Sequence, residues 1–234
     1  MAIAMKFPYS FIDLTHTLDE NIPTWEDGCG FQHHIQLDYA ACPSKVKFKI
    51  GQLKMPAGIG THLDAPAQCI PGGMTVDQLA ISQLVAPCVV IDVSADAHEL
   101  YYFSTDDIYR FEKQFFPIPP GTFVMIKTGW ERFWQEPGKY RNHYRFPAVS
   151  RDAALMLIEK QVCGLGIDTL SPDRPEDGYP VHQLWLQAGK FIVENAANLN
   201  NLPIIGSFIM PVPIKVKQAT EAPIRLLALV SEKS

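Results

Sequence analysis

The sequence predicts an α/β fold, and three observations support this class. Short apolar runs rich in β-branched residues recur along the chain between turn-forming residues, which is typical of buried strands. Capped helical segments lie between several of these runs. The chain has 234 residues, of which 47% are hydrophobic and 19% charged, so it can bury a sizeable core. Because it contains no internal repeat or long linker, we expect a single domain over residues 1–234.

The elements follow from local patterns in chain order. Five runs are expected to form strands, namely residues 85–93, 122–127, 164–167, 190–193 and 224–230. We expect helices at Thr75, after Ser104 and after Ser150, because hydroxyl side chains there can accept the free N–H groups of a first turn. Residues 180–186 also have a helical pattern. The proline-rich segment 117–121 is expected to be a loop.

Charge and cysteine content narrow the class of protein. The net charge is −5 and the pI is near 5.8, without a basic cluster, so we expect a small-molecule substrate and no nucleic-acid partner. No apolar run approaches membrane-spanning length and no secretory signal is recognisable, so we expect no membrane partner. The five cysteines are odd in number and lack C-x-x-C spacing, which argues against a disulfide framework. These features predict reduced thiols and a cytoplasmic protein.

The segment 60–66 (GTHLDAP) is the clearest indication of chemistry. If it is extended, His62 and Asp64 point to the same face, because strand side chains alternate with period two. Imidazole nitrogen and carboxylate oxygen are both good ligands for Zn²⁺ or Mn²⁺. The alternative is that the Asp-Ala-Pro sequence opens a turn while His62 forms an ordinary hydrogen bond. This short motif alone leaves both interpretations open.

A second group of polar residues lies far along the chain. Glu194 ends the apolar run 191–193, where an ionised carboxylate is costly to bury unless it is paired or binds a metal. His182 lies in a helical-looking stretch whose apolar residues would seat it against the sheet. Taken alone, Glu194 is better explained by an ion pair with Lys190 or Arg225. Taken alone, His182 is explained as a core histidine bonded to the backbone.

Read together, the two segments resemble the cyclase family of metal-dependent hydrolases, of the kynurenine formamidase and isatin hydrolase type. The first signature of that family is His-x-Gly-Thr-His-x-Asp-x-Pro-x-His, which aligns with residues 58–68. The second is Gly-Ile-Asp-x-x-Ser-x-Asp, which aligns with residues 166–173 and is followed by a histidine and a glutamate. Segments 13–16, 127–130 and 222–225 look like the opening, central and closing strands of the family.

The resemblance implies a particular fold, site and activity. The fold is a swivelling three-layer β/β/α domain with a central mixed barrel-like sheet, expected as a homodimer or homotetramer. The metal ligands are His62, Asp64, His182 and Glu194, holding one divalent ion, Zn²⁺ or Mn²⁺. The implied activity is hydrolysis of a small amide or lactone, as in arylformamidase, which hydrolyses N-formylkynurenine in tryptophan catabolism.

The chain departs from the first signature at both ends, where Gly58 and Gln68 replace histidines. Gly58 removes a ligand, which favours one metal ion over two. Gln68 removes a proton-transferring ring, because an amide can orient water but cannot take up its proton. We therefore expect Glu194 to manage the proton, with Gln68 and His182 completing the catalytic set.

These departures leave two alternatives to that activity. One is a catalytically silent small-molecule-binding homologue with a degenerate metal site. The other is an enzyme for a different ring-opening or dehydration reaction, in which Gln68 binds substrate. Two further groups of residues are open to more than one interpretation. Asp168, Ser171 and Asp173 either support the ligands or form an ordinary turn. His33 and His34 could replace the missing ligand, although a surface position is expected.

Overall fold

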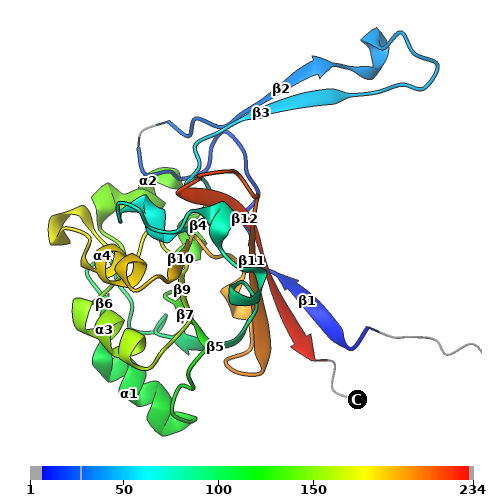
Figure 1. The fold of residues 1–234 in the computed structure, drawn as a ribbon. Coiled ribbons are helices and arrows are strands. Elements are labelled where there is room, and N and C mark those ends of the chain that lie inside the picture. Colours follow the sequence, from blue (N-terminus) through cyan, green and yellow to red (C-terminus); the bar gives the residue numbers. More distant parts are fainter. Residues whose placement is uncertain (1–6, 27, 232–234) are drawn as a thin grey trace, which may run out of the picture.

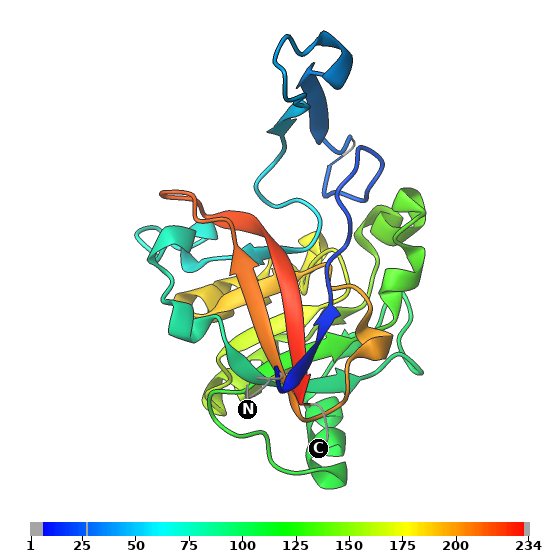
Figure 2. The ribbon, with the colours of Figure 1, turned by 90° about the vertical axis from the view of Figure 1, so that its right-hand side faces the viewer.

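The computed structural model describes residues 7–26 and 28–231, and a closed barrel of seven strands lies at its centre (Figures 1 and 2). In order around the barrel the strands are β12 (Glu221–Ser231), β11 (Ser207–Pro213), β5 (Ala86–Asp92), β7 (Phe123–Lys127), β9 (Gly164–Ile167), β10 (Phe191–Glu194) and β4 (His62–Asp64). The pairing of β12 with β4 closes the ring, and β1 (Tyr9–Asp13) adds to β12. The expected mixed barrel-like sheet is confirmed, while the swivelling three-layer arrangement and the single domain stay predictions.

β9 and β10 are buried at every position and β7 at all but its last, which explains their continuous apolar runs, whereas β11 and β12 alternate between buried and more exposed positions. β5, β7, β9 and β10 run parallel, and the remaining barrel pairings are antiparallel. In β7, Met125 packs inside the barrel, whereas Val124 and Ile126 pack on its outer side with the helices. Alternation therefore divides β5, β7 and β10 between an inner and an outer apolar layer.

Helices cover one flank of the barrel, as Figure 1 shows. The longer ones are α1 (Thr105–Gln114), α3 (Arg151–Glu159) and α4 (Pro180–Gln187), and a shorter one is α2 (Pro137–Arg141). Ser150 caps α3 as predicted, since its hydroxyl accepts a hydrogen bond from the N–H of Ala153. Ser104 precedes α1, where the Asp107 carboxylate accepts from its backbone N–H. Between the longer elements lie short 3₁₀ turns at Tyr39–Ala41, Pro66–Gln68, Val76–Gln78, Ile81–Gln83, Trp130–Phe133, Asn142–Tyr144, Pro175–Asp177 and Leu199–Asn201, and a short pair of strands, β6 (Tyr102–Phe103) and β8 (Ala148–Val149).

Three predicted elements differ from the structure. The helix expected at Thr75 is a single 3₁₀ turn, because the chain returns to an extended conformation at Leu79. Segment 13–16 begins at the last residue of β1, and segment 127–130 begins at the last residue of β7. In segment 127–130, Gly129 adopts a left-handed conformation with φ of +72° and starts a 3₁₀ turn. Both strand predictions are therefore wrong beyond their first residue.

A two-stranded hairpin, which we call the arm, projects from the barrel (Figures 1 and 2). It consists of residues 32–54, with the strands β2 (Gln32–Leu37) and β3 (Ile50–Lys54) paired antiparallel. His33 and His34 are exposed on β2, which agrees with the expected surface position. Their place on the arm separates them from His62 and Asp64, so they do not replace the missing ligand.

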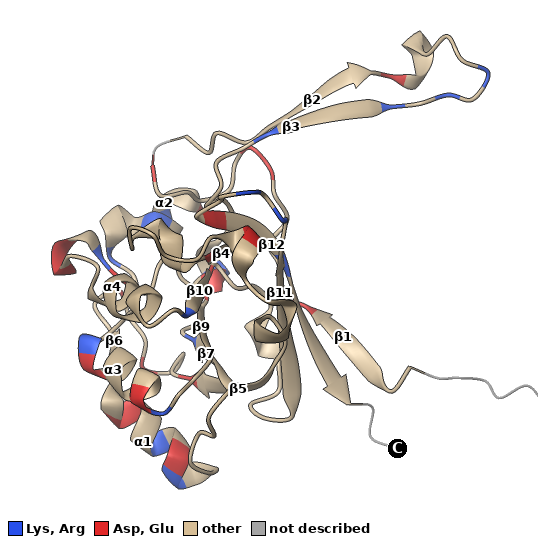
Figure 3. Cartoon of the chain, viewed as in Figure 1, with Lys and Arg blue, Asp and Glu red and all other residues tan. Residues whose placement is uncertain are grey.

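The distribution of charge gives no sign of an extended basic surface in the view of Figure 3, where Lys and Arg are scattered over the body and the arm. Among the described residues, none of the helices combines the length and apolar character that a membrane span requires. All five cysteines are free thiols.

Candidate metal-binding site

The segment that carries His62 and Asp64 is a buried strand, β4, so the extended interpretation is confirmed. Leu63 packs inside the barrel, and alternation therefore turns His62 and Asp64 to the outer face. On the neighbouring strand β10, Glu194 lies directly opposite His62. Cross-strand partners share a face of the sheet, so the barrel brings together residues that are far apart in the sequence.

The imidazole of His62 is oriented by the backbone. Its Nδ1 donates to the carbonyl of Gly60 at 2.9 Å, and the side-chain amide of Asn195 donates to the same carbonyl at 2.9 Å. This leaves Nε2 directed at the carboxylates, 3.5 Å from Asp64 Oδ1 and 3.3 Å from Glu194 Oε2. A metal-ligating histidine is commonly fixed in this way through its other nitrogen.

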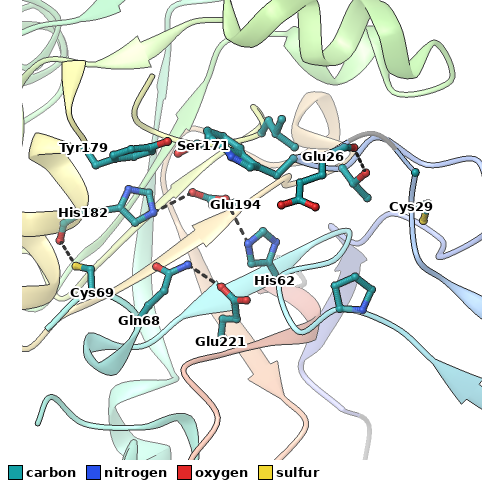
Figure 4. Close-up of a pocket in the computed structure, with 16 residues that line it drawn as sticks. Glu26, Cys29, His62, Gln68, Cys69, Ser171, Tyr179, His182, Glu194 and Glu221 are labelled. Atoms are coloured by element: carbon teal, nitrogen blue, oxygen red, sulfur yellow. Dashed lines mark hydrogen bonds and ion pairs between the residues drawn. The ribbon is translucent and has the colours of Figure 1, made fainter. Parts of the chain in front are cut away.

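His182 is held by a carboxylate at the start of α4. Asp173 accepts hydrogen bonds from the backbone N–H groups of Val181 (3.0 Å) and His182 (2.8 Å) and from His182 Nδ1 (2.8 Å). The opposite nitrogen, Nε2, lies 3.7 Å from Asp64 Oδ2 and 3.4 Å from Glu194 Oε1. Both imidazoles therefore present Nε2 to the same two carboxylates, as Figure 4 shows for Glu194.

The donor set and its spacing fit a divalent cation. One ligand atom each from His62, Asp64 and Glu194 lies within 4.8 Å of the others, and all three residues are buried. Two atoms that are each about 2.0–2.2 Å from a tetrahedral Zn²⁺ lie roughly 3.3–3.6 Å apart, close to the separations found here. Asp64 Oδ2 and Glu194 Oε1 are buried without a hydrogen-bond donor. A cation would supply the interaction that these oxygens lack.

Electrostatics favour positive charge at this point. Burial alone would lower the pKa of His62, but the charge of Asp64 and the hydrogen bond and charge of Glu194 raise it to about 10. Burial likewise opposes charge on His182, yet Asp173, Asp64 and Glu194 raise its pKa well above the usual value. Burial would raise the pKa of Glu194, but the neighbouring imidazoles of His182 and His62 lower it to about 2. Glu194 is thus held ionised, and its expected role in handling the proton stays a prediction.

The site opens into a cavity of about 610 Å³, within the range of small-molecule pockets. His62, His182 and Glu194 lie on one side of it, and Trp25 and Tyr179 contribute aromatic surface. The volume exceeds what a single ion needs. A cavity of this size can hold a small organic molecule beside the buried cluster.

The structure thus brings together all four predicted ligands, although the roles of these residues stay predictions. Glu194 contacts the two imidazoles, whereas Arg225 pairs with Asp13, so the alternative Glu194–Arg225 ion pair is not formed. Asp173 supports a site residue, as the resemblance implies. Asp168 instead accepts hydrogen bonds from the N–H and hydroxyl of Thr128 at 2.8 and 2.7 Å.

Gln68 is part of the same cluster, and it reveals a residue that the sequence analysis missed. Its side-chain amide donates to Asp64 Oδ1 at 3.0 Å and to Glu221 Oε2 at 2.7 Å (Figure 4). Glu221 also lines the cavity. It directly precedes the predicted closing strand 222–225, and its proximity to Asp64 depends on a strand register that the sequence does not display.

The sequence profile of the family described as "Putative cyclase" matches residues 12–174. The match covers more than half of the chain, so this chain belongs to that family. Together with the His-Asp-Glu cluster, this membership defines a cyclase-family metal-dependent hydrolase.

Individual relatives cover most of the chain at moderate identity. Isatin hydrolase of Roseibium aggregatum is 31% identical over an alignment of 187 residues that covers 73% of this chain and 71% of the relative. Kynurenine formamidase of Bacillus cytotoxicus is 27% identical over 222 residues, covering 93% and 96% of the two chains. The solved structure of isatin hydrolase A from Labrenzia aggregata, bound to benzyl benzoate, superimposes with a TM-score of 0.86 at 29% identity, covering 96% of this chain and 95% of that one.

Proposed function

We propose that this protein hydrolyses a small amide or lactone with the help of one divalent cation, Zn²⁺ or Mn²⁺. The observation that carries the proposal is the convergence of His62, Asp64 and Glu194 beside a small-molecule cavity. Two relatives support it, because their names, isatin hydrolase and kynurenine formamidase, denote hydrolysis of isatin and of a formamide. An arylformamidase-like reaction in tryptophan catabolism is the specific form of the proposal.

The chain's own residues would divide the work as follows. A bound cation would polarise the substrate carbonyl and lower the pKa of a water molecule. His62, Asp64, Glu194 and His182 would hold the cation, and Asp173 would keep the His182 ring in place through its 2.8 Å hydrogen bond. Because Gln68 already donates to two carboxylates, its amide orients groups in the site and takes up no proton.

Aromatic surface in the cavity favours a planar substrate. Trp25 and Tyr179 both line the cavity, with ring centroids 6.1 Å apart and planes tilted by 48°. Tyr179 also contacts His182 edge-on, with centroids 6.2 Å apart. These rings supply apolar contact next to the polar cluster. We therefore propose an amide or lactone attached to or fused with an aromatic ring.

We further propose that the protein forms a homodimer or homotetramer through the arm. Tyr39, Val46, Phe48, Ile50 and Leu53 are large apolar residues exposed on the arm. An isolated two-stranded hairpin is marginally stable at best in water, and clustered exposed apolar residues mark interaction surfaces. A second copy of the chain would cover these residues.

Metal content followed by a substrate screen tests the proposed activity. Elemental analysis of dialysed protein should find no more than one divalent ion per chain, because the ligand atoms of His62, Asp64 and Glu194 gather at one point. The metal-loaded protein should hydrolyse at least one member of a panel of aryl formamides, lactones and cyclic imides, and chelation should abolish this turnover. Two ions per chain would contradict the single-ion site. Absence of metal, or binding of panel compounds without turnover, would instead indicate a silent binding homologue.

A further inference from the structure

Glu221 has a place in the site that mirrors the place of Glu194. β4 lies between β10 and β12, and each of its two outward side chains has a carboxylate directly opposite: Glu194 faces His62 and Glu221 faces Asp64. Ala222, the next residue in β12, packs inside the barrel, so alternation turns Glu221 outward. Glu221 therefore shares a face and a cavity with the proposed ligands.

The pairing of Asp64 with Glu221 requires explanation, because like charges directly opposite each other on neighbouring strands are destabilising. Gln68 supplies one part of the explanation. Its amide lies between the two carboxylates and donates one hydrogen bond to each, at 3.0 and 2.7 Å. This contact fixes Glu221 Oε2, and the carboxylate points toward His62 in Figure 4. Two acidic groups are thus held together at the edge of the buried cluster, where Asp64 Oδ2 still lacks a donor.

Gly58 supplies the other part. A Cβ atom built at Gly58 would lie 3.0 Å from the Glu221 carboxyl carbon and 3.1 Å from each of its oxygens. The carboxylate of Glu221 therefore occupies the space into which a side chain at position 58 would extend. This is the position where the family signature begins with histidine. The carboxylate of Glu221 has room in this position because residue 58 has no side chain.

We propose that Glu221 is a metal-binding residue of this chain, positioned by Gln68, and that it replaces the ligand which Gly58 cannot provide. The inference rests on the proposed metal-dependent function and adds a residue to its site. The cation would then be held by ligands on the three neighbouring strands β4, β10 and β12 together with His182 of α4. With glycine at position 58 in place of the family's histidine, the ligand would come from Glu221 on β12 instead.

Titration calorimetry with Mn²⁺ and with Zn²⁺ tests this inference on the dialysed protein. Glu221→Gln keeps the shape of the side chain and removes its charge, so it should weaken metal binding by about 10- to 100-fold, at least the effect of losing an outer partner of a ligand. Glu221→Asp keeps the charge and should weaken binding less. Glu26→Gln is the matched control, because Glu26 lines the same cavity from the loop before β2. Its metal affinity should match that of the wild type.

A second pair of variants tests the exchange of positions 58 and 221. Gly58→His alone should weaken metal binding, since its Cβ would meet the Glu221 carboxylate. Adding Glu221→Ala to it should restore affinity to within about 10-fold of wild type, as an imidazole then fills the vacated space. A structural role for Glu221 would not produce this rescue.

The outcomes separate the two proposals. Wild-type metal affinity in Glu221→Gln, together with no rescue in the double variant, would overturn the inference and leave the metal-dependent function standing. A wild-type protein that binds neither ion would overturn the proposed function, and the inference with it.

Discussion

The strands β3 and β4 follow one another in the chain, yet all five residues of β3 are exposed and all three residues of β4 are buried. The difference lies in their neighbours. β4 has β10 on one edge and β12 on the other, whereas β3 pairs with β2 alone among the described strands. A strand that is paired on both edges can hold a buried carboxylate oxygen that lacks a hydrogen-bond donor, such as Asp64 Oδ2, because its backbone is fixed on both sides. The arm lacks this support and presents apolar side chains to solvent.

The largest expected effect tests this contrast with the same substitution in both strands. Leu63→Ala in β4 should lower the free energy of unfolding by about 2–5 kcal/mol, since Leu63 is fully buried inside the barrel. Leu53→Ala in β3 should change it by less than about 0.5 kcal/mol, because Leu53 is 58% exposed. Urea unfolding at low protein concentration measures both. Equal losses would show that the arm folds against the body more closely than described.

The next effect concerns metal rather than folding. Glu194→Gln should weaken binding of Zn²⁺ or Mn²⁺ by at least about 100-fold, because removing a ligand should exceed the 10- to 100-fold loss typical of an outer partner. Asp38→Asn, the matched loss of a carboxylate on the arm, should leave the affinity unchanged. Calorimetry gives the affinity, and thermal unfolding with and without metal reports the fold. If Glu194→Gln altered stability but not affinity, Glu194 would be an ion-pair partner and not a ligand.

Much of the site is predictable from local sequence because the rules involved are local. Period-two alternation places His62 and Asp64 on one face, and β4 confirms this. The cost of burying a charge marks Glu194 as a residue that needs a partner, and the structure gives it two imidazoles. Capping chemistry predicts the start of α3 at Ser150. Each of these inferences uses a residue and its near neighbours in the chain.

What escapes prediction depends on register and on packing between distant segments. Glu221 faces Asp64 because β12 pairs with β4 in one particular register, and a shift of one residue would turn Glu221 into the barrel. The helix expected at Thr75 has a starting signal, with the Gln78 side chain accepting from the Thr75 N–H at 3.0 Å. It ends after one 3₁₀ turn, and Val76 packs into the barrel core. A cap predicts where a helix can begin, while packing decides how far it continues.

A smaller effect should appear as a pH dependence of stability in the metal-free protein. The folded-state pKa of His62 is raised from 6.5 to about 10, so its stabilising contribution is complete below pH 6.5 and disappears as the pH rises toward 10. The folded-state pKa of Glu194 is lowered from 4.5 to about 2, so its contribution is complete above pH 4.5 and disappears as the pH falls toward 2. From this pair, we expect the greatest stability between about pH 5 and 6.5.

Thermal unfolding between pH 5 and 9, with chelator and with added metal, measures this dependence. Metal should offset the alkaline loss, because a ligating imidazole must be unprotonated and its proton is released on binding. His62→Gln is the control and should flatten the alkaline slope of the metal-free protein. A slope identical to that of the wild type would assign the pH dependence to other groups.

The smallest effect on the folding of the chain is expected on the arm, where the consequence should instead be loss of association. Phe48→Ser should leave urea unfolding of the isolated chain nearly unchanged, because Phe48 is 52% exposed. It should nevertheless shift the protein from dimer or tetramer to monomer in sedimentation velocity over a range of concentrations, since the apolar arm is proposed to pack on a second copy. Phe208→Ser is the matched control, an exposed phenylalanine on the barrel strand β11. If the wild-type protein stayed monomeric at the highest concentration, the arm would not be an interface. If Phe208→Ser caused dissociation and Phe48→Ser did not, the interface would lie away from the arm, and the exposed apolar residues of the arm would be unexplained.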